Sequence, residues 1–244
     1  LFDSAQINCI FEDQTNNLWI GTLNGLFKLG KDRKFIKRYQ TGSKKADGMT
    51  NDLIWSISET EKGTLWLCSD DGLIKFDMAQ ERFTTFLQNE SDHQSLSDNR
   101  TTCVEPDSHG ALWIGTSGGG MNRLDVQTNK FTRFTVKDGL PSNFIYGILF
   151  DDEERIWLST AKGLACFEQT LKKFYHFNKQ DNIQGFKFNI KSYLKSRDGE
   201  LYFGGSNGLN RINPDIFYQR NFIPPVRISS IDIINKGKGT RRII

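Results

Sequence analysis

The sequence has few of the residues that build disulfide frameworks, metal sites or membrane spans. Its 244 residues include only four cysteines, three histidines and five prolines. No two cysteines have the CxxC spacing, and the three histidines lie far apart in the sequence, so no metal site is predicted. The longest apolar run, Phe144 to Phe150, is far shorter than the roughly 20 residues that a membrane helix needs. Any membrane attachment is therefore expected to lie in segments outside this chain.

The sequence also lacks an excess of charge of either sign. It has 32 basic and 29 acidic residues, a formal net charge of +3, and the two signs are interspersed. This balance gives no reason to expect nucleic acid as a partner. Hydrophobic residues make up 37% of the chain, which is enough for a folded globular protein. No targeting signal is present, and because the chain opens on Leu1 within a repeat, we expect it to be a piece of a longer protein.

A short phrase, of which LWIGT followed by GL is typical, occurs five times with an aromatic residue at its centre. Successive aromatic residues lie 44 to 47 residues apart. A period in this range, carried by β-forming residues and glycine, predicts a β-propeller. The five aromatic residues are Trp19, Trp66, Trp113, Trp157 and Tyr202.

Aligning the repeats on this aromatic residue predicts the strands of one blade. Apolar residues on both sides of it indicate a strand that is buried between layers. Positions ten residues before and two residues after it hold only small residues, as expected where inner strands crowd around an axis. Hairpin turns are predicted before it, stabilised by Asp13, Asp107, Asp151 and Asp198. A glycine six residues after it begins a third strand, and paired aromatic residues mark a fourth. The predicted fold is all-β, a propeller of four-stranded blades.

The end of the chain departs from the repeat pattern. The fifth repeat has no clear outer strand, and Pro224-Pro225 forms a stiff boundary. We therefore expect propeller blades over residues 1–222. Residues 223–244 are expected to be a linker and the first strand or strands of a truncated β-sandwich domain.

Special residues within the repeats give little sign of catalysis. Each cysteine lies in the repeat pattern and is predicted to be a buried free thiol. The inner-strand positions carry no set of carboxylates, and the aspartates lie in turns. The glycine run 118–120 lies between two strands rather than before a helix, so it is not a phosphate-binding loop. No catalytic residue, metal or cofactor is predicted.

One position of the inner strand varies where its neighbours do not, and this predicts a ligand site. It lies eleven residues before the central aromatic residue. Aromatic rings at this position are suited to stacking on a sugar, and polar side chains to hydrogen bonding it. An equally weighted interpretation is that Trp55 and Tyr146 fill the central channel. The five residues are Asn8, Trp55, Thr102, Tyr146 and Lys191.

The loops that enter successive inner strands are long and dissimilar. They cover residues 40–53, 87–99, 135–144 and 178–189. Variable loops on a rigid repeated frame are common sites of recognition. A scaffold that binds another protein through these loops is therefore an alternative to a ligand-binding propeller. A propeller glycosidase or lyase is a third hypothesis, which a cluster of carboxylates near the axis would support.

The repeat phrase, together with the Ile-x-x-Ile-x-x-Asp pattern before it, resembles the two-component regulator propeller repeat. The segment from Ile223 to Lys236 is similar to the entry of the β-sandwich that follows such propellers. The resemblance implies a periplasmic sensor region of a bacterial hybrid two-component histidine kinase. It implies a homodimeric receptor that senses oligosaccharides, with the kinase elsewhere in the protein. Propellers of this family typically have seven blades, so the five repeats are expected to belong to a larger propeller.

A five-blade arc with missing neighbours would expose apolar blade faces. Such faces predict self-association of the isolated chain. The alternative is that five blades close by an unusual route.

Overall fold

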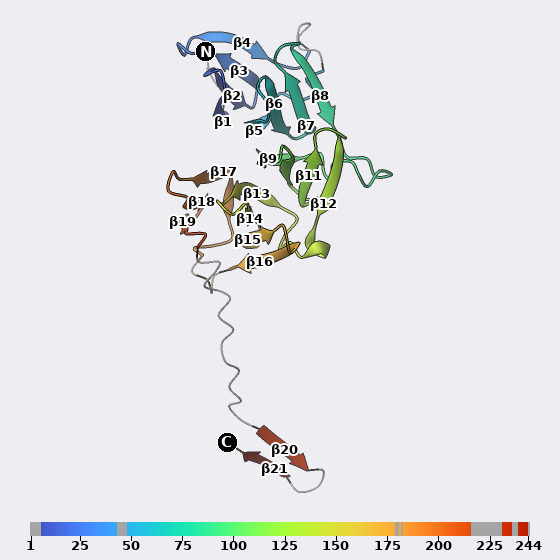
Figure 1. Ribbon diagram of the computed structural model, residues 1–244, viewed down its shortest axis with the longest axis vertical. Coiled ribbons are helices and arrows are strands. Elements are labelled where there is room, and N and C mark those ends of the chain that lie inside the picture. Colours follow the sequence, from blue (N-terminus) through green and yellow to red (C-terminus); the bar gives the residue numbers. More distant parts are fainter. Residues whose placement is uncertain are drawn as a thin grey trace. The chain divides into compact units, whose positions relative to one another are not determined.

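A computed structural model describes residues 6–42, 48–178, 181 and 183–215, and the backbone of 231–235 and 239–243. The chain divides into two compact units, residues 1–212 and 213–244. The first unit is an all-β propeller whose five sheets follow one another around an axis (Figure 1). The predicted domain boundary at 222/223 lies outside the described residues.

The first four blades are four-stranded antiparallel sheets in which each strand pairs with the next. Blade 1 contains β1 (Ile7–Glu12), β2 (Leu18–Thr22), β3 (Gly25–Leu29) and β4 (Phe35–Tyr39). Blade 2 contains β5 (Ile54–Glu59), β6 (Thr64–Ser69), β7 (Gly72–Asp77) and β8 (Arg82–Phe86). Blade 3 contains β9 (Thr101–Pro106), β10 (Leu112–Thr116), β11 (Met121–Asp125) and β12 (Lys130–Phe134). Blade 4 contains β13 (Ile145–Phe150), β14 (Ile156–Thr160), β15 (Gly163–Glu168) and β16 (Lys173–Phe177).

The fifth blade has three strands among the described residues, in line with its missing outer-strand pattern. They are β17 (Phe188–Lys195), β18 (Leu201–Gly205) and β19 (Gly208–Ile212). A single 3₁₀ turn, η1 (Val136–Asp138), lies between blades 3 and 4. In the second unit, β20 (Ile231–Asn235) and β21 (Gly239–Ile243) form an antiparallel hairpin. The strand predicted from Val226 begins outside the described residues.

In the first four repeats the central tryptophan is buried and forms a hydrogen bond with the turn that precedes it. The indole Nε1 of Trp19 donates to Asp13 Oδ2 at 2.7 Å. Asp13 Oδ1 also accepts the backbone N–H groups of Thr15 and Asn17. The same indole–carboxylate bond recurs in blades 3 and 4, and Thr60 replaces the aspartate in blade 2. The predicted turn aspartates in these three blades therefore also fix the orientation of the buried indole. In blade 5 the position equivalent to Asp13 holds Ser196, which forms a hydrogen bond with the side chain of the predicted Asp198.

Burial by itself would raise the pKa of Asp13, but hydrogen bonds outweigh this effect. The donors are Thr15, Trp19 and Asn17, and together they lower the pKa of Asp13 to about 2. Hydrogen bonds to a carboxylate stabilise its ionised form. The turn is therefore built around a charged Asp13 side chain.

Small residues at two repeat positions allow neighbouring blades to approach closely. A Cβ on Gly21 would lie 2.8 Å from Cγ2 of Ile54, which belongs to the next blade. Gly115 stands in the same relation to Ile145, again at 2.8 Å. Both distances are well below normal carbon–carbon contact, so a larger side chain would push the blades apart. The prediction that these positions serve inter-blade packing is confirmed.

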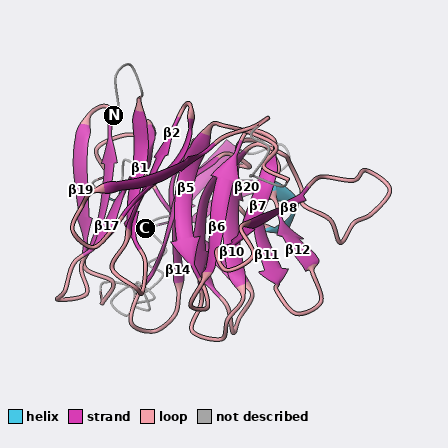
Figure 2. Ribbon diagram, turned by 90° about the horizontal axis from the view of Figure 1, so that it is seen from above, coloured by secondary structure: helices cyan, strands magenta, loops and turns pink. Residues whose placement is uncertain are grey.

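The long loops and the short β2–β3-type turns meet at one end of the blades, as predicted. The N–H of Gly25 donates to the carbonyl of Asp52, and that of Gly72 to the carbonyl of Asn99. Gly120 makes the equivalent bond in blade 3 and has positive φ, so it takes the place that the repeat pattern gave to Gly119 at the start of the third strand. The turn of blade 3 is one residue longer, which explains the shift. Figure 2 shows the turns gathered at the two ends of the strands.

The first and last blades expose apolar side chains at positions that inner blades bury. Ile10 in β1 is 61% exposed, whereas the equivalent Ile57 in blade 2 is 3% exposed. In blade 5, Leu194 and Leu209 are 62% and 58% exposed. Ile10 and Leu194 line a groove between the first and fifth blades, so their exposure does not by itself indicate further blades. A larger propeller therefore stays a prediction.

Candidate ligand site

The variable position of the inner strand is the site of a β-bulge. The pairing of β1 with β2 skips Asn8, because Ile7 pairs with Thr22 and Cys9 with Gly21. The pairings of β5, β9 and β13 skip Trp55, Thr102 and Tyr146 in the same way. A bulged residue is released from the strand's regular alternation, so its side chain does not have to fit one repeated environment. This explains why the position varies.

Two of the bulged residues bind the next blade. Asn8 Nδ2 donates to the carbonyl of Ile54 at 3.1 Å. Thr102 Oγ1 donates to the carbonyl of Ile145 at 2.7 Å, and Thr102 is buried. Both bonds join one inner strand to the inner strand that follows it. These side chains therefore have an inter-blade role in addition to any contact with a ligand.

The two aromatic members of the predicted site lie apart from each other. Trp55 is half-buried, packs against the apolar cluster that lies between blades 2 and 3, and donates through Nε1 to Asp70 Oδ1 at 2.8 Å. The ring of Tyr146 lies 4.7 Å from that of Phe144, measured between centroids. Among the described residues, no ring contact joins Trp55 to Tyr146. The predicted aromatic pair is therefore not one stacking platform.

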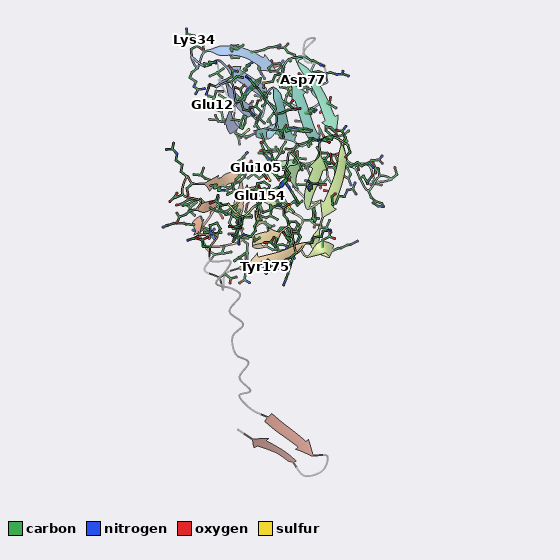
Figure 3. All side chains as sticks on the ribbon, in the orientation of Figure 1. Glu12, Lys34, Asp77, Glu105, Glu154 and Tyr175 are labelled. Carbon is green, nitrogen blue, oxygen red and sulfur yellow. The ribbon has the colours of Figure 1, made fainter. Side chains whose placement is uncertain are left out.

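Lys191 lies at the centre of a charged cluster that joins blade 5 to blade 3. Its Nζ is 3.7 Å from Glu105 Oε1. The hydroxyl of Tyr193 donates to the same oxygen at 3.2 Å. Figure 3 labels Glu105 where β9 lies near β17. Tyr193 reaches blade 3 by passing over Gly147 of blade 4, where the absence of a side chain leaves room for its ring.

Burial dominates the electrostatics of this cluster. It raises the pKa of Glu105, an effect that Lys191 and Tyr193 counteract only in part. Burial also raises the pKa of Tyr193 well above its ordinary range. The Glu105 side chain is still 26% exposed and that of Lys191 is 22% exposed. The charged pair is therefore partly desolvated but reachable from solvent.

An open groove of about 540 Å³ runs past this cluster between β1 and β17. It brings together two of the five predicted site residues, Asn8 and Lys191, whereas Trp55, Thr102 and Tyr146 do not line it. A second groove of about 480 Å³ on blade 5 shares Lys191, Tyr193 and Leu194 with it and adds Tyr202 and Leu209. The first groove is lined by Ile7, Asn8, Cys9, Ile10, Glu105, Leu149, Lys191, Tyr193, Leu194 and Lys195.

The groove contains a thiol but no activated nucleophile. Burial raises the pKa of Cys9 to about 11 and that of Cys103 to about 12. A thiol rather than a thiolate is present at neutral pH, and the thiol is a poor nucleophile. All four cysteines are buried and free, as predicted. In the part of the chain that the structure describes, no three His, Cys, Asp or Glu side chains are grouped as a metal site.

Glu105 and Tyr193 were not predicted as site residues. Both break the pattern of their repeat position. Tyr193 aligns with Ile10, Ile57 and other aliphatic residues, and Glu105 aligns with Phe11, Ser58, Leu149 and Leu194. A search for polar groups at otherwise aliphatic inner-strand positions would have found Tyr193, and Glu105 is the one charged residue at its position. Tyr193 lies in blade 5 and Glu105 in blade 3, and the repeat pattern does not predict a hydrogen bond between residues of different blades.

Comparison with protein families gives a match to the two component regulator propeller. It covers residues 1–24, 95–118 and 139–162. Histidine kinase P4 of Formosa agariphila is 27% identical over 97% of this chain, which spans 17% of that protein. No helix among the described residues has the length and apolar character needed to cross a membrane.

Solved structures show the same fold. The extracellular domain of a hybrid two-component system from B. thetaiotaomicron is 27% identical, with a TM-score of 0.83. The match covers 98% of this chain and 32% of that one. Virginiamycin B lyase from Staphylococcus aureus is 12% identical with a TM-score of 0.61, over 86% of this chain and 71% of the lyase. At that identity the lyase shows only a shared fold. The chain is thus a β-propeller of five described blades, and the two component regulator propeller model matches three stretches of it.

Proposed function

We propose that this chain is part of the periplasmic sensor region of a hybrid two-component system, and that it binds an oligosaccharide without transforming it. The observation that carries the sensor role is the likeness to an extracellular domain of such a system over 98% of the chain. The relative named as a histidine kinase supports the same role. Because the chain spans a minor part of both proteins, the kinase is expected in another part of the full-length receptor.

The groove between β1 and β17 supports the proposed ligand. It combines a partly exposed ion pair with exposed aliphatic side chains, such as Leu194 at 62% exposure. Sugars present hydroxyl groups along their edges and C–H groups on their faces, so this mixture suits them. Among the described residues that line the groove, Glu105 is the only acidic side chain, whereas glycoside hydrolysis uses a pair of carboxyl groups. Binding rather than glycoside hydrolysis is therefore the function that we propose.

The position of the groove between two blades provides the proposed link between ligand binding and signalling. It lies between the inner strands of the first and fifth blades, so a ligand that contacts both β1 and β17 favours one spacing of these strands. In a homodimeric receptor, such a preference would shift the population of dimer arrangements. The free energy available for this shift equals the ligand's difference in affinity for the two arrangements.

Calorimetry of the intact sensor region against a panel of oligosaccharides tests this proposal. Leu194→Asp places a carboxylate on the groove wall and should weaken binding by roughly tenfold or more, because the bound sugar would have to desolvate it. Leu171 is a matched control, since it is 65% exposed but lies in the turn between β15 and β16. Leu171→Asp should leave the affinity unchanged. If no oligosaccharide binds, or if both variants bind as the wild type does, the groove is not a sugar site.

A further inference from the structure

The backbone of Lys191 is unusual for a residue within a strand. Its φ angle is +61°, in the left-handed region that a residue with a Cβ rarely adopts. Among the described residues, six other non-glycine residues have positive φ, and each lies in a turn between two strands. They are Asn16, Arg33, Glu81, Asn129, Glu154 and Lys172.

Lys191 instead lies inside β17, where the pairing with β18 is interrupted between Phe188 and Tyr193. An unfavourable backbone conformation persists only where its surroundings hold it, and such positions are concentrated at functional sites. In this conformation the Lys191 ammonium lies beside Glu105 at the edge of the groove. The strain and the charged cluster are separate observations that single out the same residue.

The contacts of Lys191 and Glu105 leave hydrogen-bonding capacity for a ligand. Their separation of 3.7 Å is longer than a hydrogen bond, so the ammonium retains its donors. Tyr193 and Lys191 both approach Oε1 of Glu105. No residue of the described chain donates a hydrogen bond to Oε2. A pair of neighbouring hydroxyl groups can therefore donate to Glu105 and accept from Lys191.

The charges that line the groove are already balanced. Lys191 faces Glu105, and Lys195 Nζ lies 2.7 Å from Asp152 Oδ1. An acidic ligand would compete with Glu105 for Lys191 and would place a second carboxylate beside the first. Repulsion of this kind is how a binding site discriminates against a wrong partner. An uncharged ligand avoids it.

We propose that Glu105 and Lys191 bind the hydroxyl groups of an uncharged saccharide and select against saccharides that carry carboxylates. This inference rests on the proposed function, because it specifies the class of oligosaccharide and the residues that contact it. Leu194 and Ile10, both more than 60% exposed, offer apolar surface to the sugar faces. The paired charges supply specificity, and the apolar walls supply contact area.

The test compares neutral gluco-, galacto- and xylo-oligosaccharides with glucuronic and galacturonic acid oligomers of the same length, by calorimetry on the intact sensor region. We expect any saccharide that binds to be neutral, with the acidic oligomers weaker by roughly tenfold or more. Glu105→Gln keeps hydrogen bonding but removes the charge, so it should narrow this difference. A preference for acidic oligomers would overturn the inference and leave the proposed function intact.

Lys191→Gly separates ligand binding from structural support. Glycine accepts the left-handed backbone, which offsets part of the stability lost with the Glu105 ion pair, so the variant should stay folded while the sugar affinity falls by roughly tenfold or more. Lys172→Gly is the matched control, because Lys172 has φ +50° in a turn outside the groove. It should leave the affinity unchanged. Unaltered sugar binding by Lys191→Gly would overturn the inference. The absence of binding to any oligosaccharide would instead refute the proposed function.

Discussion

Replacing Asp151 by asparagine should destabilise the propeller far more than the same change at Asp107. Both aspartates accept an indole hydrogen bond and backbone hydrogen bonds within their turns. Only Asp151 also accepts from a buried arginine, since Arg155 Nε lies 2.7 Å from its Oδ2 and both side chains are at most 3% exposed. The equivalent contact of Asp107 is with Arg123, at 4.0 Å, and the Arg123 side chain is 38% exposed.

The magnitude follows from these contacts. Asparagine would present an amide N–H₂ group to two N–H donors, and the Arg155 guanidinium would lose its facing carboxylate. Breaking a buried ion pair costs about 3–5 kcal/mol. Losing the indole bond at Asp107 costs about 1–2 kcal/mol. For a chain of this size, 1 kcal/mol shifts the melting temperature by about 2–4 °C.

Differential scanning calorimetry of the two variants measures the difference. We expect Asp151→Asn to lower the melting temperature by about 6–20 °C and Asp107→Asn by about 2–8 °C, so the difference between the variants is the decisive quantity. Equal shifts would show that the Asp151–Arg155 pair adds nothing to the shared turn, which would refute the reasoning.

Two further predictions concern the turn of blade 1 and the ligand groove. The pKa of Asp13 falls from its ordinary value of 3.8 to about 2 on folding, so its stabilising contribution of about 2 kcal/mol is present above pH 4 and is lost as the pH falls towards 2. The free energies of unfolding of the wild type and Asp13→Asn, measured with urea, should therefore converge as the pH falls from 4 to 2. A difference that stays constant over this interval would contradict the lowered pKa of Asp13. Gly147→Ala would place a Cβ 2.2 Å from the Tyr193 ring, so it should weaken sugar binding as well as stability. Gly115→Ala, which meets Ile145 at 2.8 Å, should lower stability alone, and equal effects on affinity would argue against a role for Tyr193.

The repeat positions predicted the fold because each one is set by geometry that recurs in every blade. The buried Trp19, the small Gly21 and the charged Asp13 follow from local turns and from contact with the next blade. Sequence columns record such constraints directly. The number of blades is different, because the repeat pattern describes one blade at a time and does not fix how many follow one another around the axis.

The ligand site was harder to predict, because it depends on departures from the repeat. Asn8 and Lys191 were found through the variability of their position, and both line the groove. The variability of that position arises from the bulge, so the same criterion also selected Trp55, whose indole donates a hydrogen bond to Asp70. Glu105 reaches the site from another blade, and no spacing within one repeat contains that contact. The ligand role of all five predicted residues awaits a binding measurement.

The central claim is that this propeller senses an oligosaccharide by binding it unchanged. Its most direct test is a titration of the intact sensor region with neutral oligosaccharides, followed by mass spectrometry of the recovered sugar. The account predicts saturable binding that Lys191→Gly weakens and Lys172→Gly does not, with the sugar recovered at its original mass. Absence of binding, or recovery of shortened or unsaturated products, would contradict it.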